Sequence, residues 1–166
     1  LHSNGYSLVR RVLLEDGQLT IASRLREFDC PLGEVLLTPT RIYAKQVLAL
    51  IATHSIHGIA HITGGGIKEN LPRVLPKGTR AVVQRGNWVV PPIFSLIQRM
   101  GSVPMEEMDR VFNMGIGLIL AVPKANADAV IRQAEALGDR CSVIGDVVAD
   151  EASEPWVEYV GEYRRG

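Results

Sequence analysis

Length, composition and charge place this chain among ordinary folded domains. It has 166 residues, of which 46% are hydrophobic and 22% are charged, which suits one domain with a real core and excludes wholesale disorder. Its 18 Lys and Arg residues balance 18 Asp and Glu residues, so it lacks the electrostatic footprint of a protein that binds nucleic acid or an anionic membrane. Any site for an anion must therefore be local.

The first third of the chain predicts two helices joined by a loop. Apolar residues at helical spacing run from Tyr6 to Leu13, and Ser3 or Asn4 is placed to cap that helix. Residues 16–33 carry mixed signals and indicate a loop with a short helix at most. A second helix is expected to open at the Thr-Pro-Thr of residues 38–40, because proline is tolerated in a first helical turn. Its expected apolar face consists of Ile42, Tyr43, Val47, Leu48, Leu50 and Ile51.

The middle of the chain alternates strands with short helices. The expected segments are a strand at 58–63, a helical turn at 68–74 broken by Pro72, a strand at 80–84, a helix at 91–100 and a short helix at 105–111. Three glycines, Gly64, Gly65 and Gly66, stop the first strand. The spacing of Ile93, Phe94 and Ile97 turns one face of the longer helix toward the core.

The last third predicts a strand, a helix and two further strands. Residues 117–122 are almost wholly apolar, so we expect a central strand covered on both faces. A helix at 125–137 ends at Gly138, a favoured C-cap residue. A strand at 142–148 follows, and residues 156–160 are expected to form an edge strand.

Helices and strands are interspersed, without an internal repeat or a linker. This pattern predicts an α+β fold, a single layered domain with a mixed sheet and helices. The order strand, helices, strand, helix, strand over residues 80–148 resembles a split βαβ, or ferredoxin-like, arrangement.

The strongest local feature is the run AHITGGGIKENLPR at residues 60–73. Glycines let the backbone adopt positive φ and bring N–H groups close to a ligand, and such groups before a helix form an anion-binding nest. Thr63 adds a hydroxyl, and Asn70 and Arg73 are expected to reach toward a phosphate or an amide, with His61 at the mouth of the turn. A simple tight turn explains the three glycines equally well.

Two further segments combine small and polar residues. His2, Ser3 and Asn4 precede a helix start, which fits a phosphate or ribose site as well as an ordinary cap. The Gly-x-Gly that follows Asn113 begins at Gly115 and precedes a strand, whereas a dinucleotide fingerprint follows one. It is therefore either a packing turn or a place where Asn113 and Gly115 lie beside a substrate.

The sequence gives little support for a metal site or for a nucleophile or P-loop motif. His54, His57 and His61 match no zinc spacing, so no metal site is expected. No nucleophile elbow, phosphate-binding P-loop or Cys–His signature is present. The acidic residues Glu106, Glu107 and Asp109 are expected to form a solvated helix face.

The cysteines and the apolar runs of the sequence indicate the redox state and the location of the protein. Cys30 and Cys141 form no CxxC pair, so free thiols of a cytoplasmic protein are expected, although the sequence leaves a disulfide open. The longest apolar run, residues 115–123, is too short to span a bilayer. The chain enters its first helix within five residues and without an initiator Met, as expected of a piece cut at a domain boundary.

Several of these motifs together resemble the C-terminal half of the phosphoribosylformylglycinamidine cyclo-ligase (AIR synthetase) family. The resembling segments are, in order, residues 1–10, 38–43, 61–73, 88–94, 112–117 and 144–145. The resemblance covers about residues 1–150, while the tail from 151 to 166 matches poorly. It implies that the whole chain is one domain and that an N-terminal ATP-binding domain lies outside it.

The resemblance also implies an activity. The family uses ATP to activate the amide oxygen of formylglycinamidine ribonucleotide as an iminophosphate, and a ring nitrogen then attacks to close aminoimidazole ribonucleotide, releasing ADP and phosphate. ATP and Mg²⁺ would bind mainly in the N-terminal domain, through which the full-length protein would form a homodimer. The fragment alone is then expected to be inactive, with a ribonucleotide and its own N-terminal domain as partners and neither nucleic acid nor membrane among them.

Residue roles are carried over from the same resemblance. His61 and Asn70 would orient the reacting amide or phosphoryl group, and the substrate would meet His2, Ser3, Asn4, Thr63, Gly64, Gly65, Gly66, Arg73, Asn113 and Gly115. Two alternatives remain. One is a same-fold enzyme of the formylglycinamidine ribonucleotide synthetase, selenophosphate synthetase or thiamine-monophosphate kinase type. The other is a free-standing binding module without catalysis.

Overall fold

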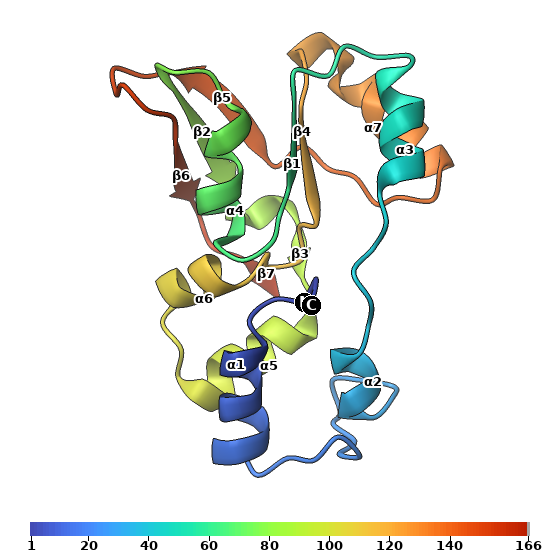
Figure 1. The fold of residues 1–166 in the computed structure, drawn as a ribbon, viewed down its shortest axis with the longest axis vertical. Coiled ribbons are helices and arrows are strands. Elements are labelled where there is room, and N and C mark those ends of the chain that lie inside the picture. Colours follow the sequence, from blue (N-terminus) through green and yellow to red (C-terminus); the bar gives the residue numbers. More distant parts are fainter. Residues whose placement is uncertain (166) are drawn as a thin grey trace.

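The computed structural model describes residues 1–165 as strands in three small ladders surrounded by helices (Figure 1). The helices are α1 Tyr6–Val9, continued by a π-helix at Arg10–Asp16, then α2 Leu32–Leu36, α3 Ala44–Ile51, α4 Gly66–Asn70, α5 Pro92–Gly101, α6 Met105–Val111 and α7 Ala127–Ala136. The strands are β1 Gly58–His61, β2 Thr79–Gln84, β3 Val89–Val90, β4 Leu118–Ala121, β5 Gly145–Ala149, β6 Trp156–Val160 and β7 Arg164–Arg165. Single turns of 3-10 helix lie at Pro72–Val74, Arg85–Asn87 and Lys124–Asn126.

Strand pairing is mixed in direction, as an α+β fold with a mixed sheet predicts. Strand β2 lies between β5, to which it is antiparallel, and β6, to which it is parallel. Strand β1 pairs antiparallel with β4, and β3 pairs parallel with β7. The expected edge position of residues 156–160 is confirmed by β6. The strands of the expected split βαβ arrangement are divided between two ladders, because β4 pairs with β1 while β2 and β5 pair with each other.

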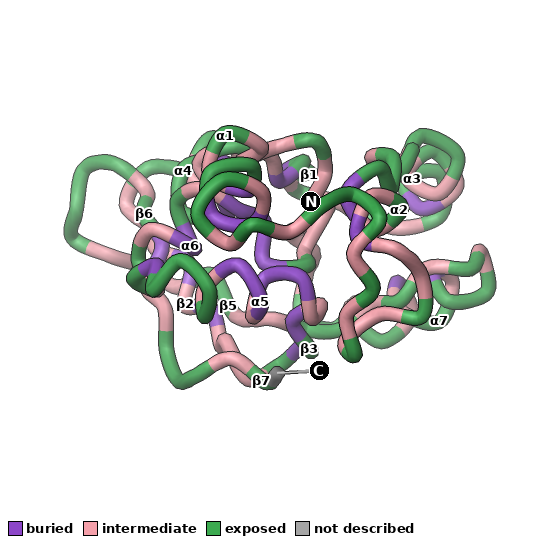
Figure 2. The backbone as a smooth tube through the Cα atoms, turned by 90° about the horizontal axis from the view of Figure 1, so that it is seen from below, coloured by how far each residue is buried: buried purple, intermediate pink, exposed green. Residues whose placement is uncertain are grey.

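The apolar residues form one large cluster and one small one. Phe94 and Phe112 lie at the centre of the large cluster, with ring centroids 5.5 Å apart and at most 2% of either residue exposed. Figure 2 shows the buried segments gathered around α5, whereas the end of the molecule with α3 and α7 is mostly exposed or half-buried. There the small cluster of Leu50, Val130 and Ala134 joins α3 to α7. Ile93, Phe94 and Ile97 are buried, which confirms the predicted inward face of α5.

The β4 run is apolar throughout because its two faces contact different clusters. Ile119 packs against the large cluster, and Leu120 and Val122 pack against the small one. All four residues of β4 are half-buried, and β1 is its partner among the described residues. The expectation of a central sheet strand was therefore wrong, since an unbroken apolar run also arises where a strand separates two cores.

The helix expected to open at residues 38–40 begins later, at Ala44. Residues 38–43 cross the molecule as an extended segment between α2 and α3 (Figure 1). Side-chain hydrogen bonds tie this segment to the N-terminal residues, because Thr40 Oγ1 lies 2.9 Å from Ser3 Oγ and the Tyr43 hydroxyl 3.0 Å from His2 Nε2. Of the expected apolar face of the helix only Leu50 is buried, and Ile42 is 82% exposed.

The predicted cap of the first helix is also wrong. The N-cap residue is Gly5, with φ 75°, and it makes no side-chain cap hydrogen bond. Ser3 is bonded to Thr40, and Asn4 Nδ2 donates to the His2 carbonyl oxygen at 2.6 Å. The Ser3 side chain thus joins the segment before α3 and the Asn4 side chain the turn before α1, and neither caps the helix. The other predicted helices and strands are present, with ends shifted by a few residues.

Among residues 1–165, no helix is both long enough and apolar enough to cross a bilayer.

Candidate functional site

The glycine turn is the segment Gly64, Gly65 and Gly66 between β1 and α4. Gly65 has φ 91° and Gly66 has φ 58°, conformations that residues with a Cβ adopt at a cost. The Gly65 N–H donates to the Arg110 carbonyl oxygen and the Gly66 N–H to that of Thr63, both at 3.0 Å. A Cβ on Gly66 would overlap the Asp109 carbonyl oxygen and lie 2.9 Å from that of Phe112. Glycine at this position therefore allows the turn to lie against the end of α6.

Asn70 holds the glycine turn from inside the protein. It is 6% exposed, and its Nδ2 donates to the carbonyl oxygens of Gly64 at 3.0 Å and Gly66 at 2.8 Å. Because both donations go to the turn, this amide group shapes the turn. It does not point freely toward solvent, as the expected reach to a phosphate would require.

The N-terminal segment lies directly beside the glycine turn, although the two are far apart in the sequence. A Cβ on Gly64 would lie 3.3 Å from Asn4 Oδ1, which places the Asn4 amide in contact with this glycine. Gly64 is itself exposed. The structure thus brings together the two segments that the sequence singled out separately.

Three rings gather next to this contact. The ring centroids of His2 and His61 are 5.5 Å apart, and that of Tyr43 lies 5.7 Å from His2 and 6.0 Å from His61. The Tyr43 hydroxyl lies 3.0 Å from His2 Nε2, and the other ring nitrogen of His2 is buried without a hydrogen-bond partner. A Cβ on Gly117 would overlap both the Tyr43 hydroxyl and the His2 ring, so a glycine is needed where β4 begins.

Burial sets the protonation of two of these rings. Burial lowers the pKa of His2, and the neighbouring His61 lowers it further. The pKa of the Tyr43 hydroxyl is raised, chiefly by burial, although the charge of Arg41 opposes the shift. His2 is therefore held toward its neutral form, in which one ring nitrogen can accept a proton. Sequence reasoning missed Tyr43 as a site residue because it placed this side chain on the apolar face of a helix.

Asn113 and Gly115 form a turn behind the site. Asn113 is 4% exposed, and its Oδ1 accepts the Gly115 N–H at 3.2 Å. Gly115 has φ 99° and lies against Pro91. Phe112, next to Asn113, has its carbonyl oxygen beside Gly66, so this turn supports the glycine turn through the backbone.

The remaining predicted residues lie on the outside. Ser3 and Arg73 are exposed, and Thr63 is half-buried between β1 and the glycines. Arg73 makes no ion pair with any of residues 1–165. These side chains are accessible to a ligand, but the structure gives Arg73 no contact with the glycine turn.

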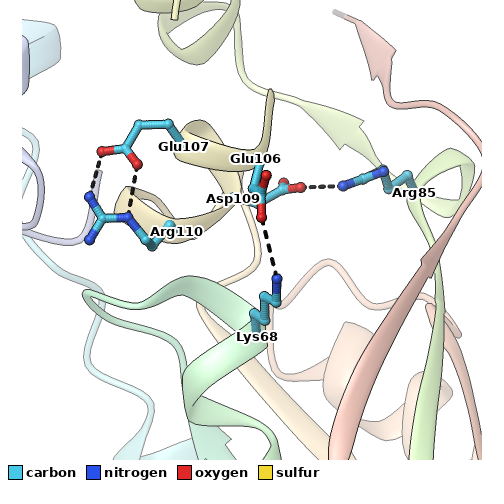
Figure 3. Close-up of polar contacts among 6 residues, drawn as sticks. All are labelled: Lys68, Arg85, Glu106, Glu107, Asp109 and Arg110. Atoms are coloured by element: carbon cyan, nitrogen blue, oxygen red, sulfur yellow. Dashed lines mark hydrogen bonds and ion pairs between the residues drawn. The ribbon is translucent and has the colours of Figure 1, made fainter. Parts of the chain in front are cut away.

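The acidic residues of α6 divide between two faces of the helix (Figure 3). Glu107 pairs with Arg110 on one side, and Glu106 lies 3.7 Å from Lys68 Nζ. Asp109 is 3% exposed and pairs with Arg85, so its expected place on a solvated face was wrong. The signal was present, because Asp109 shares helical spacing with Met105, Met108 and Phe112, of which Met108 and Phe112 are buried and Met105 half-buried.

An open hollow of about 410 Å³ lies beside this ion pair. Its lining residues are Lys68, Arg85, Met105, Glu106, Asp109 and Tyr159. The hollow is thus lined by α4, α6 and β6 and not by His2, Asn4 or His61. The two cationic side chains in this lining already form ion pairs, Lys68 with Glu106 and Arg85 with Asp109.

Over residues 1–165, no group of three or more His, Cys, Asp or Glu residues is arranged to hold a metal ion. Mg²⁺ that is bound with a nucleotide usually takes one or two protein carboxylates together with the phosphate oxygens of the nucleotide. Cys30 and Cys141 are free and half-buried, and burial, with Asp139 and Glu135 nearby, raises the pKa of the Cys141 thiol.

The groups that converge on the Asn4–Gly64 contact share a simple chemistry. They are a carboxamide, two imidazoles, a phenol hydroxyl and the backbone of a glycine turn. Such groups bind anions and amides through hydrogen bonds and can hold or pass a proton. The arrangement suits a reaction in which positioning and charge stabilisation carry the catalysis.

Known proteins and a known protein family are similar to this chain over most of its length. Residues 1–158 match the family described as AIR synthase related protein, C-terminal domain. A phosphoribosylformylglycinamidine cyclo-ligase of Bacillus cytotoxicus is 51% identical over 148 residues, which cover 89% of this chain and 43% of that protein. Cyclo-ligases of Bacillus mycoides and Bacillus thuringiensis are 49% identical over 148 residues. The chain thus spans less than half the length of the curated relatives it matches.

Proposed function

The chain belongs to the family of AIR synthase related protein C-terminal domains, and on that premise we propose that it is the C-terminal half of a phosphoribosylformylglycinamidine cyclo-ligase. The resemblance drawn from the sequence is confirmed at the level of the family. In this proposal residues 1–166 form one domain, and the ATP-binding domain lies in the part of the protein outside this chain. The whole protein would close formylglycinamidine ribonucleotide to aminoimidazole ribonucleotide, with release of ADP and phosphate.

The observation that carries the proposal is the contact between Asn4 and Gly64. This contact places residues 2–4, which precede α1, against the glycine turn, with the rings of His2 and His61 beside them. A phosphate or amide at this place would meet a carboxamide, a neutral imidazole and the exposed backbone of Gly64. These groups come from residues 1–10 and 61–73, two of the segments on which the resemblance to the family rests.

The proposed roles follow from where each residue lies. His2, Ser3 and Asn4 bind the phosphate or ribose of the substrate, with Arg73 as an accessible cation. Thr63 and the glycine turn shape the surface that faces the substrate, and His61 orients the reacting amide. Asn70 fixes the glycine turn through its hydrogen bonds to Gly64 and Gly66. Asn113 and Gly115 form the neighbouring turn that supports the glycine turn.

Cofactor, partner and location complete the proposal. When bound, ATP with Mg²⁺ supplies the phosphoryl group that makes the amide oxygen of the substrate a leaving group. The resemblance to the family, whose nucleotide site lies mainly in the N-terminal domain, supports placing nucleotide binding in the domain outside this chain. We place the full protein in the cytoplasm as a homodimer, without nucleic acid or membrane as partners.

A test is to replace His61 in the full-length protein that contains this chain. His61→Ala is expected to lower turnover of formylglycinamidine ribonucleotide by at least about tenfold, as losing a group that orients a reacting amide or moves a proton does. The matched control is His57→Ala, because His57 is exposed and bonded to Ser55. Unchanged turnover in His61→Ala would remove His61 from the site.

A further inference from the structure

The side chains of Arg85, Asp109, Tyr159 and Tyr163 form a cluster that is not used by the proposed reaction, in which Asp109 is buried and the other three are half-buried. Tyr163 donates its hydroxyl to Asp109 Oδ1 at 2.5 Å, and Arg85 Nη2 donates to Asp109 Oδ2. The Arg85 guanidinium lies over both tyrosine rings, 4.4 Å from the Tyr159 centroid and 5.2 Å from that of Tyr163. Both carboxylate oxygens of Asp109 are therefore held by groups that follow β2 and β6.

The same stretch of α6 holds the glycine turn through its backbone. The Arg110 carbonyl oxygen accepts the Gly65 N–H at 3.0 Å, and the carbonyl oxygens of Asp109 and Phe112 lie where a Cβ on Gly66 would be. The side chain of Asp109 thus points into the cluster while its carbonyl oxygen lies against the turn. Asn4 contacts the turn at Gly64.

We propose that the Arg85–Asp109–Tyr163 cluster is a positioning device, which fixes the end of α6 so that its carbonyl oxygens hold the glycine turn against Asn4. Because Asp109 is 3% exposed, its charge is stable there only with both partners in place. The stacked tyrosines fix the guanidinium, and the guanidinium fixes the carboxylate. These three side chains become positioning residues of the candidate site, and that part of the inference rests on the proposed function.

The first test measures the turn itself and needs no substrate. In the ¹⁵N-labelled chain, Tyr163→Phe removes the hydroxyl bonded to Asp109 but keeps the ring against Trp88 and Arg85. It is expected to speed hydrogen exchange of the Gly65 amide about threefold to tenfold, the effect of losing a typical hydrogen bond. Amides of α7, which packs in the other cluster, should keep their exchange rates.

Asp109→Asn provides a second, larger perturbation, and Glu107→Gln is its matched control. Both replace an acid of α6 by its amide, but Glu107 pairs with Arg110 on the exposed side of the helix (Figure 3). Exchange at Gly65 should rise in Asp109→Asn and stay within about twofold of wild type in Glu107→Gln, since exposed ion pairs contribute little. A uniform rise in exchange across all slow amides, or none at Gly65, would show a purely structural cluster and overturn the proposal.

The second test measures whether the cluster affects ligand binding. Formylglycinamidine ribonucleotide is titrated into wild type and Tyr163→Phe while the Gly64–Gly66 amide shifts are followed. Weaker binding in the variant, by about threefold to tenfold, supports the positioning role, and equal binding contradicts it. If wild type does not respond at all, the proposed function fails, whereas the exchange test still decides whether the cluster holds the turn.

Discussion

At the scale of residues, Gly66 has the tightest surroundings within the glycine turn. Its φ of 58° and the overlap of a Cβ with the Asp109 carbonyl oxygen both oppose any side chain. Gly66→Ala is expected to lower the free energy of unfolding by roughly 2–5 kcal/mol, from the left-handed backbone and the overpacking together. Chemical denaturation measures this loss.

Gly138 offers a matched control for that substitution. It has φ 86°, but a Cβ there would meet no atom within 4 Å. Gly138→Ala should therefore cost only the backbone term, about 1–2 kcal/mol. Equal losses at Gly66 and Gly138 would show that the close approach of α6 to the turn is absent.

His2 makes stability depend on pH below neutrality. Its pKa is lowered in the folded chain, first by burial and then by the neighbouring His61. The unfolded chain therefore binds a proton on His2 at a pH where the folded chain does not, so stability rises with pH across this window. The loss on acidification begins as the pH falls through the ordinary histidine value of about 6.5 and is complete below the folded value.

The measurement is urea denaturation of wild type and His2→Gln at pH 5.5 and 7.5, with His57→Gln as control. The difference in unfolding free energy between the two pH values should shrink in His2→Gln and persist in His57→Gln, whose ring is at the surface. A pH difference that His2→Gln leaves unchanged would assign the acid sensitivity to other groups.

At the scale of elements, α3 is joined to the rest by a few contacts. Leu50 is 3% exposed and packs with Val130 and Ala134 of α7, whereas Leu48 on the same helix is 63% exposed. Leu50→Ala is expected to cost at least about 2 kcal/mol, and Leu48→Ala less than about 0.5 kcal/mol. Hydrogen exchange should show the loss of Leu50 first in α3 and α7, because the small cluster is separate from the large one.

Elements with a strong local pattern could be predicted from the sequence. The face of α5 follows from the spacing of Ile93, Phe94 and Ile97, and the strand before the glycines follows from its composition and its stop. The start of α3 could not be predicted, because hydrogen bonds from Ser3 and His2 hold Thr40 and Tyr43 outside the helix. Helix propensity depends on the local sequence and does not include hydrogen bonds to residues that are distant in the sequence.

The sequence predicted the segments of the candidate site but not the contacts between them. The glycine turn and the polar helix start each stood out by residue type, but the contact of Asn4 with Gly64 and the ring of Tyr43 depend on long-range packing. Asp109 was misplaced because its charge was given more weight than its helical position. The helical spacing of Asp109 indicates burial, but its partners Arg85 and Tyr163 come from distant segments that the sequence does not pair with it.

At the scale of the whole molecule, the chain spans 43% of the length of a cyclo-ligase that is 51% identical to it. In the proposed function, binding of the ribonucleotide is separable from its cyclisation, because the ATP-binding domain lies outside this chain. The Asn4–Gly64 surface would bind formylglycinamidine ribonucleotide weakly without help, whereas release of phosphate from ATP would need the Mg²⁺–nucleotide site outside this chain.

The purified 166-residue chain is accordingly expected to bind the ribonucleotide without turning over ATP. Nuclear magnetic resonance shifts at Gly64–Gly66 report the binding, and phosphate release reports turnover. Thiamine monophosphate is the control ligand, because a binding surface specific for the formylglycinamidine group should distinguish it from another phosphate ester of similar charge. Phosphate release by the chain alone would contradict the division of labour between domains, and a stronger response to thiamine monophosphate would favour a same-fold kinase over the cyclo-ligase.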